Sequence, residues 1–124
     1  MKTRPPEMGR RDGRQGAWGL IGLCVRAGQL VSGESGCEAA VRAGQAGLVL
    51  LDAGASGNLR KKFQDACAYR RLPMCTLDAG RLGQAIGKPG RMVAAVKAGV
   101  MADRLRAMLS DEAPEDRPSG FEAE

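Results

Sequence analysis

Apolar residues follow two different spacings along this chain, and the spacing changes from one segment to the next. Apolar residues three or four positions apart predict helices at about residues 14–27, 35–43, 59–70, 78–86 and 100–109. Short apolar runs between turn residues predict strands at about residues 30–31, 48–51, 74–77 and 92–96. The alternation predicts an α/β fold, a three-layer α/β/α sandwich with a four-stranded mixed, largely parallel sheet.

Local signals place some of these segments within the fold. Residues 48–51 are all apolar, which is typical of a strand buried on both faces, so we expect this strand near the centre of the sheet. Ser35 and Glu38 match the S-x-x-E pattern of a capping box, which predicts Ser35 as the N-cap of the second helix, with Gly44 beyond its end. Asp78 is expected to cap the fourth helix.

The segment from Leu30 to Gly36 is a glycine-rich turn that leads directly into the second helix. The first N–H groups of a helix have no intrahelical acceptor, and the helix dipole is positive there. An exposed turn of this kind suits phosphates and the edges of nucleobases. A capping box would also explain Ser35 and Glu38 by helix stability alone, and both interpretations stay open.

Length and composition predict one domain with a tail at each end. A chain of 124 residues has room for one domain with a real core. Residues 1–13 and 112–124 lack apolar periodicity and contain prolines, so we expect a basic and an acidic disordered tail around a domain at 14–111. The sequence contains no apolar run long enough for a membrane span or for a signal peptide, which favours a cytoplasmic protein.

The residue types argue against metal binding and catalysis. The chain has four cysteines and no histidine, and no two cysteines form a C-x-x-C pair. We therefore expect buried free thiols rather than a metal site, and Ser-His-Asp and Cys-His catalysis are excluded. The pair Gly87-Lys88 lacks the glycine spacing of a P-loop, and no G-x-G-x-x-G segment occurs. We expect neither a cofactor nor enzymatic activity.

Basic residues dominate the central part of the chain. The net charge is +5, but residues 15–109 alone carry thirteen basic and six acidic side chains. The cations cluster at residues 60–62, at residues 70–71 and at Lys88 with Arg91. This pattern favours a polyanionic partner, although the run at 60–62 would also fit a solvated helix face. With only four aromatic residues in the chain, recognition of several stacked bases is not expected.

Four segments in a fixed order carry a resemblance to a known family. They are residues 19–28 (GLIGLCVRAG), 31–34 (VSGE), 58–63 (NLRKKF) and 82–88 (LGQAIGK). Together they resemble the YlxQ-like bacterial branch of the ribosomal protein L7Ae superfamily, over about residues 17–109. The resemblance implies a compact α/β/α domain that binds structured RNA, with relatives that grip kink-turns and sit in ribosomes or ribonucleoprotein particles.

The resemblance also implies which positions meet RNA. In the relatives a G-x-N-E-x-x-K segment enters the RNA groove, and a loop before the last strand covers an extruded nucleotide. With Gly33 on the motif glycine, Ser35 stands at the Asn position, Gly36 at the Glu position and Ala39 at the Lys position. Two polar side chains are therefore absent, so we expect RNA binding to be retained better than kink-turn selectivity. The residues that match the covering loop, which is more cationic here, are Lys88, Pro89, Arg91 and Met92.

The sequence thus predicts a non-enzymatic RNA-binding protein whose partner is a structured RNA, ribosomal or translation-associated, with ribonucleoprotein components as further partners. Two alternatives remain, a protein-interaction module for an acidic partner and a small enzyme acting on a phosphorylated substrate at the turn 54–58. The residues expected to contact RNA are Ser32, Gly33, Glu34, Ser35, Gly36, Ser56, Asn58, Arg60, Lys61, Lys62, Lys88, Pro89, Arg91 and Met92.

The acidic C-terminal segment is expected to compete with RNA for the basic domain. Removal of residues 110–124 changes the net charge from +5 to +10, because that segment holds six acidic residues and one arginine. The truncated chain should therefore bind a structured RNA more tightly than the full chain at one low salt concentration. Fluorescence anisotropy titrations of both chains measure the difference, and equal affinities would disprove the competition.

Overall fold

The computed structural model describes residues 5–110, so the predicted acidic tail at 112–124 lies outside the described residues. The strands are β1 (Leu30–Ser32), β2 (Ala46–Asp52), β3 (Met74–Leu77) and β4 (Val93–Lys97). The helices are α1 (Pro5–Arg26), α2 (Glu34–Arg42), α3 (Gly57–Arg70), α4 (Arg81–Ile86) and α5 (Val100–Ser110). The elements follow the predicted order, and each strand lies within two residues of its predicted bounds.

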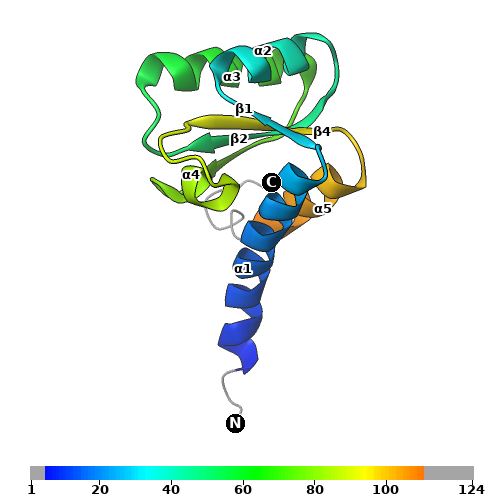
Figure 1. Ribbon diagram of the computed structural model, residues 1–124, viewed down its shortest axis with the longest axis vertical. Coiled ribbons are helices and arrows are strands. Elements are labelled where there is room, and N and C mark those ends of the chain that lie inside the picture. Colours follow the sequence, from blue (N-terminus) through cyan, green and yellow to red (C-terminus); the bar gives the residue numbers. More distant parts are fainter. Residues whose placement is uncertain (1–4, 111–124) are drawn as a thin grey trace, which may run out of the picture.

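The first helix starts earlier than predicted, at Pro5 instead of about Arg14. Apolar periodicity begins only at Ala17, and it therefore placed the start of the helix too late. Pro5 and Pro6 fit the first turn of a helix, because the N–H groups of that turn have no intrahelical acceptor. In Figure 1 the first half of α1 extends away from the sheet. The division of the chain into a domain at 14–111 and two tails stays a prediction.

The four strands form one mixed sheet in the order β1-β4-β2-β3. The prediction of a mixed sheet is confirmed, but the prediction that it is largely parallel is wrong. Only β2 and β3 are parallel, and β4 is antiparallel to both β1 and β2. The connection from β3 to β4 explains the difference. The six residues of α4 rise only about 9 Å, and the Lys88 N–H donates to the Gly83 carbonyl, so the chain after α4 stays at the edge where β3 ends.

Alternating side chains of the two inner strands divide the core into two layers. Leu48 and Leu50 of β2 pack on one side of the sheet, and Val49 and Leu51 pack on the other. Helices α1, α4 and α5 cover the first side, while α2 and α3 cover the second (Figure 1). The three-layer sandwich and the central, doubly buried position of β2 are therefore confirmed.

Both predicted helix caps are wrong, and glycine explains each case. The N-cap of α2 is Gly33 rather than Ser35, and the N-cap of α4 is Gly80 rather than Asp78. Gly33 has a φ of 95° and Gly80 a φ of 84°, a region that glycine reaches without the steric cost of a Cβ. The chain thus turns into each helix at a glycine, and the Ser35–Glu38 capping box does not form.

The cysteines are free thiols, as predicted. Cys24, Cys37 and Cys67 are buried, and Cys75 is half-buried. Burial raises the pKa of Cys37 to about 12 and that of Cys67 to about 11, so these thiols stay protonated and pack as apolar groups. Within residues 5–110, no three potential metal ligands gather into a site. None of the helices in this range is long and apolar enough to span a membrane.

Candidate functional site

The loops that carry most of the expected contact residues meet at one edge of the sheet. Strands β1, β2 and β3 all end at this edge, and β4 begins there because it runs in the opposite direction. The turns after β1, β2 and β3 therefore lie beside the loop that precedes β4. We call this surface the loop edge, and it comprises residues 32–36, 53–57, 78–80 and 87–92.

Gly33 and Arg91 join the first and last of these loops. The Gly33 N–H donates a hydrogen bond to the Val93 carbonyl over 3.0 Å, which fixes the turn to the start of β4. The guanidinium of Arg91 fills the space where a side chain at position 33 would begin, with its Nη1 atom 2.5 Å from the Cβ position. Glycine is favoured here by its φ of 95°, whereas the Arg91 guanidinium is the end of a flexible side chain that could move aside. The guanidinium lies against the start of α2.

The start of α2 presents backbone donors beside that cation. The first intrahelical hydrogen bond is donated by Cys37 to the Gly33 carbonyl over 3.0 Å, so the N–H groups of Glu34, Ser35 and Gly36 precede it. All three residues are exposed, and among the described residues no side chain caps this end of the helix. Free N–H groups, a positive dipole end and a guanidinium together favour an anionic ligand.

Asp52 holds three segments of the loop edge together. Its carboxylate is fully buried, with Oδ1 accepting from the Gly54 N–H over 2.7 Å and Oδ2 accepting from the Gly80 N–H over 2.8 Å. Its own N–H donates to the Met92 carbonyl over 2.8 Å. One residue therefore ties the turn after β2 to the turn after β3 and to the last loop. The sequence reading missed Asp52, although a lone acid directly after a buried apolar run was a usable signal.

The basic run at residues 60–62 does not form one patch. Arg60 donates to the Ala53 carbonyl over 3.1 Å and so lies against the turn after β2. Lys61 points away from the loop edge in an exposed ion pair with Asp65, at 3.1 Å. Lys62, predicted on the same exposed face, instead bridges to α2.

The bridge from Lys62 joins α3 to two carboxylates of α2. The Lys62 ammonium lies 2.7 Å from Glu34 and 3.0 Å from Glu38. The hydrogen bond to Glu34 and then that to Glu38 raise the pKa of Lys62, and the hydrogen bond from Lys62 lowers the pKa of the Glu38 carboxyl. Glu38 is therefore engaged with α3 and does not reach back to cap its own helix. No local pattern in the sequence indicates this long-range pairing.

The last loop packs on α4 and leaves its polar side chains exposed. Gly83 allows the contact, because a Cβ there would lie 2.8 Å from the Lys88 carbonyl oxygen. The Lys88 N–H donates to the Gly83 carbonyl over 2.9 Å, while the side chains of Lys88 and Pro89 face solvent. Pro89 and Gly90 share a depression with the turn at 78–81.

Ser56 caps α3 by accepting from the Leu59 N–H at 3.1 Å, and Asn58 is exposed on the first turn of that helix.

Comparison with known proteins gives a consistent set of relatives. The sequence profile of the ribosomal protein L7Ae/L30e/S12e/Gadd45 family matches residues 18–104. RNA-binding protein YlxQ of Bacillus subtilis (strain 168) is 40% identical over 91 residues, which are 73% of this chain and 91% of that protein. RNA-binding protein YlxQ of Enterococcus faecium is 38% identical over 87 residues, 69% of this chain and 84% of that protein. These relatives are named for binding, which agrees with the expectation that the chain is not an enzyme.

Solved structures show the same fold. A protein of unknown function from Bacillus halodurans superposes with a TM-score of 0.72 at 36% identity, covering 76% of this chain and 96% of that one. A 15.5kD RNA binding protein from Giardia lamblia superposes with a TM-score of 0.67 at 17% identity, covering 84% of this chain and 89% of that one. The second likeness supports the three-layer architecture alone.

The change Asp52→Asn should lower the free energy of unfolding by about 1–3 kcal/mol, because an amide places a donor against one of two buried N–H groups. Urea denaturation measures the loss. The matched variant Asp65→Asn removes the same charge from an exposed ion pair and should leave stability almost unchanged. Equal effects of the two substitutions would show that the Asp52 carboxylate does not hold the loop edge.

Proposed function

Because the chain belongs to the ribosomal protein L7Ae/L30e/S12e/Gadd45 family, we propose that it binds structured RNA through the loop edge. The observation that carries the proposal is the convergence of an uncapped helix start with a cationic loop. Arg91 lies against Gly33, and the exposed N–H groups of α2 begin directly beside it. The proposed partner is a ribosomal or translation-associated RNA, as the family resemblance implies.

Each part of the loop edge has a distinct role in this proposal. The N–H groups of Glu34, Ser35 and Gly36 hydrogen-bond phosphate or base acceptors, and Arg91 and Lys88 supply charge. The Glu34 carboxylate would repel RNA if it were alone, but its ion pair with Lys62 neutralises it. The site therefore presents donors and cations without an unpaired anion at its centre.

The charge of the whole domain supports the same partner. Residues 15–109 carry a net charge of +7, which attracts a polyanion over distances beyond direct contact. The loop edge then supplies the hydrogen-bond donors that fix the orientation of the RNA. The net charge thus supplies sequence-independent attraction, and the loop edge supplies local positioning.

Salt dependence tests the proposed surface. The double variant Lys88→Gln/Arg91→Gln removes two cations from the loop edge while keeping long polar side chains. If both contact phosphates, the slope of log K against log salt should fall in magnitude by up to about 2, at roughly 0.9 per contact on the duplex value. Anisotropy titrations with one hairpin RNA at several salt concentrations measure the slope.

A matched pair of cations controls for net charge. Lys97 lies at the opposite end of β4, Arg104 is exposed on α5, and Lys97→Gln/Arg104→Gln removes the same charge. This variant should change the slope far less than the loop-edge variant. Equal slopes for the two variants would reject the loop edge as the binding surface, and undetectable binding by the unaltered chain would reject RNA as the partner.

Kink-turn selectivity should be weak in this chain. The exposed positions 35, 36 and 39 lack the Asn, Glu and Lys of the family motif. The triple variant Ser35→Asn/Gly36→Glu/Ala39→Lys should raise the preference for a kink-turn over a plain duplex by about tenfold or more per restored base contact. Position 36 has room, since a Cβ there would meet only Val31 at 3.9 Å. Titrations of both proteins against both RNAs at one salt concentration decide the matter, and strong selectivity in the unaltered chain would contradict this expectation.

A further inference from the structure

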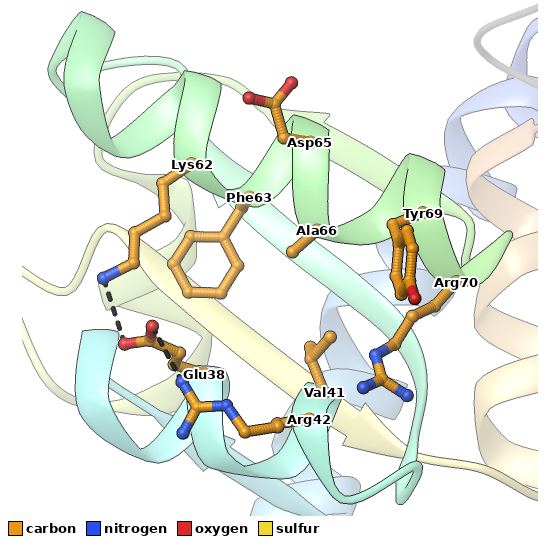
Figure 2. Close-up of a pocket in the computed structure, with 9 residues that line it drawn as sticks. All are labelled: Glu38, Val41, Arg42, Lys62, Phe63, Asp65, Ala66, Tyr69 and Arg70. Carbon is orange, nitrogen blue, oxygen red and sulfur yellow. Dashed lines mark hydrogen bonds and ion pairs between the residues drawn. The ribbon is translucent and has the colours of Figure 1, made fainter.

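A second concave surface lies between α2 and α3, the two helices that cover the second side of the sheet. A cavity of about 290 Å³ opens between α2 and α3, close to the lower size limit of roughly 300 Å³ for small-molecule sites. Figure 2 shows Val41, Phe63 and Ala66 projecting into it from the two helices. At one end lies Tyr69, a residue that is 85% exposed and lines the cavity. We call this cavity the helix groove.

Most charged side chains around the helix groove have an ion-pair partner, but Arg70 has none among the described residues. Glu38 is paired with Lys62 at 3.0 Å and with Arg42 at 3.1 Å, so its carboxylate is fully used. Asp65 is paired with Lys61. Among residues 5–110, Arg70 has no carboxylate partner, and its guanidinium carbon lies 5.9 Å from the centre of the Tyr69 ring. The open end of the groove thus combines an exposed tyrosine with a cation that lies over its ring and has no carboxylate partner among the described residues.

The helix groove is continuous with the loop edge. Both α2 and α3 begin at the loop edge and run side by side over the sheet (Figure 1). Lys62, Ala66 and Tyr69 are spaced by four and three residues, so they lie on one face of α3. From Lys62, which bridges to the first turn of α2, the rise to Tyr69 is about 10 Å. A strand of RNA leaving the loop edge along this groove reaches Tyr69 within a short distance.

We propose that the helix groove receives an unpaired base of the bound RNA, stacked on Tyr69 with Arg70 beside the neighbouring phosphate. The inference rests on the proposed RNA-binding function and adds a single-stranded subsite to it. Stacking on an exposed aromatic ring accepts any base, because each base has a flat face. A base that enters the groove contacts its apolar wall and breaks none of the ion pairs around it.

An acidic peptide fits the helix groove less well. Its carboxylates would have to compete with Glu38 for Lys62 and Arg42, which leaves Arg70 as the one cation of the cavity that is free of carboxylates among the described residues. The chain's own C-terminal segment is acidic and contains Phe121, so its sequence has the chemistry of such a peptide. The experiment below therefore includes it as an outcome.

Paired RNAs test the subsite in the full chain. One is a blunt hairpin, and the other is the same hairpin with a short single-stranded extension at its 3′ or 5′ end. The unaltered chain should bind one of the extended forms more tightly, by roughly 5- to 150-fold for one stacked base. Tyr69→Ala should abolish this gain and leave blunt-hairpin binding unchanged, whereas Tyr69→Phe should keep the gain. Tyr69 is exposed, and thermal melting checks that both variants stay folded.

The outcomes separate this inference from the proposed function. If the unaltered chain binds the blunt hairpin but gains nothing from either extension, or if Tyr69→Ala keeps the gain, the subsite is rejected while RNA binding stands. If the blunt hairpin is not bound, the proposed function itself fails. Comparison of NMR spectra of the full chain and of its Phe121→Ala variant, both without RNA, tests whether the C-terminal segment occupies the groove. Shifts at Val41, Phe63 and Tyr69 on that substitution would show that the C-terminal segment occupies the groove, which also overturns the inference.

Discussion

The direction of β4 decides where the loops of this domain meet. β4 pairs antiparallel with both β1 and β2, so it begins at the edge of the sheet where those strands end. The loop with Lys88 and Arg91 is thereby brought beside the turn at Gly33. In an all-parallel sheet the same loop would lie at the opposite edge, about 17 Å away along the five residues of β4. The loop edge exists because the connection through α4 brings the chain back to the edge where β3 ends.

Two polar contacts then fix the loops that the topology has gathered. Asp52 accepts hydrogen bonds from Gly54 and Gly80, and a buried carboxylate is tolerated there because backbone donors take up both of its oxygens. At Gly33, the backbone N–H donates to the Val93 carbonyl and ties the first turn to the start of β4. The loops therefore form a defined surface although they come from distant parts of the chain. A surface fixed before binding loses less conformational entropy when a ligand arrives.

Ion pairs within the fold decide which charged residues remain available to a ligand. Lys62 is cationic in the sequence, but in the fold it pairs with Glu34 and Glu38 and links α2 to α3, while Arg42 also pairs with Glu38. Lys61 is balanced by Asp65 at the surface. Arg91 and Lys88 at the loop edge and Arg70 at the helix groove make none of these ion pairs, so they remain for a polyanion. Net charge attracts such a partner, but the local pairing decides which surfaces it meets.

The sequence alone determined the order of elements, the strands and the two-sided burial of β2, because apolar periodicity and turn residues are local signals. The family resemblance added structured RNA as the expected ligand. Spacing could not give the direction of β4, which depends on where the connection through α4 leaves the chain. Tertiary structure also decided the helix caps at Gly33 and Gly80. At Gly33, a glycine turn bonded to the start of β4 replaces the capping box that the local Ser35–Glu38 pattern predicts. Gly80, which donates to Asp52, and Glu34, which pairs with Lys62, each lie 28 residues away from their partners. Contacts across such separations are set by the packing of whole elements, and no local pattern records them.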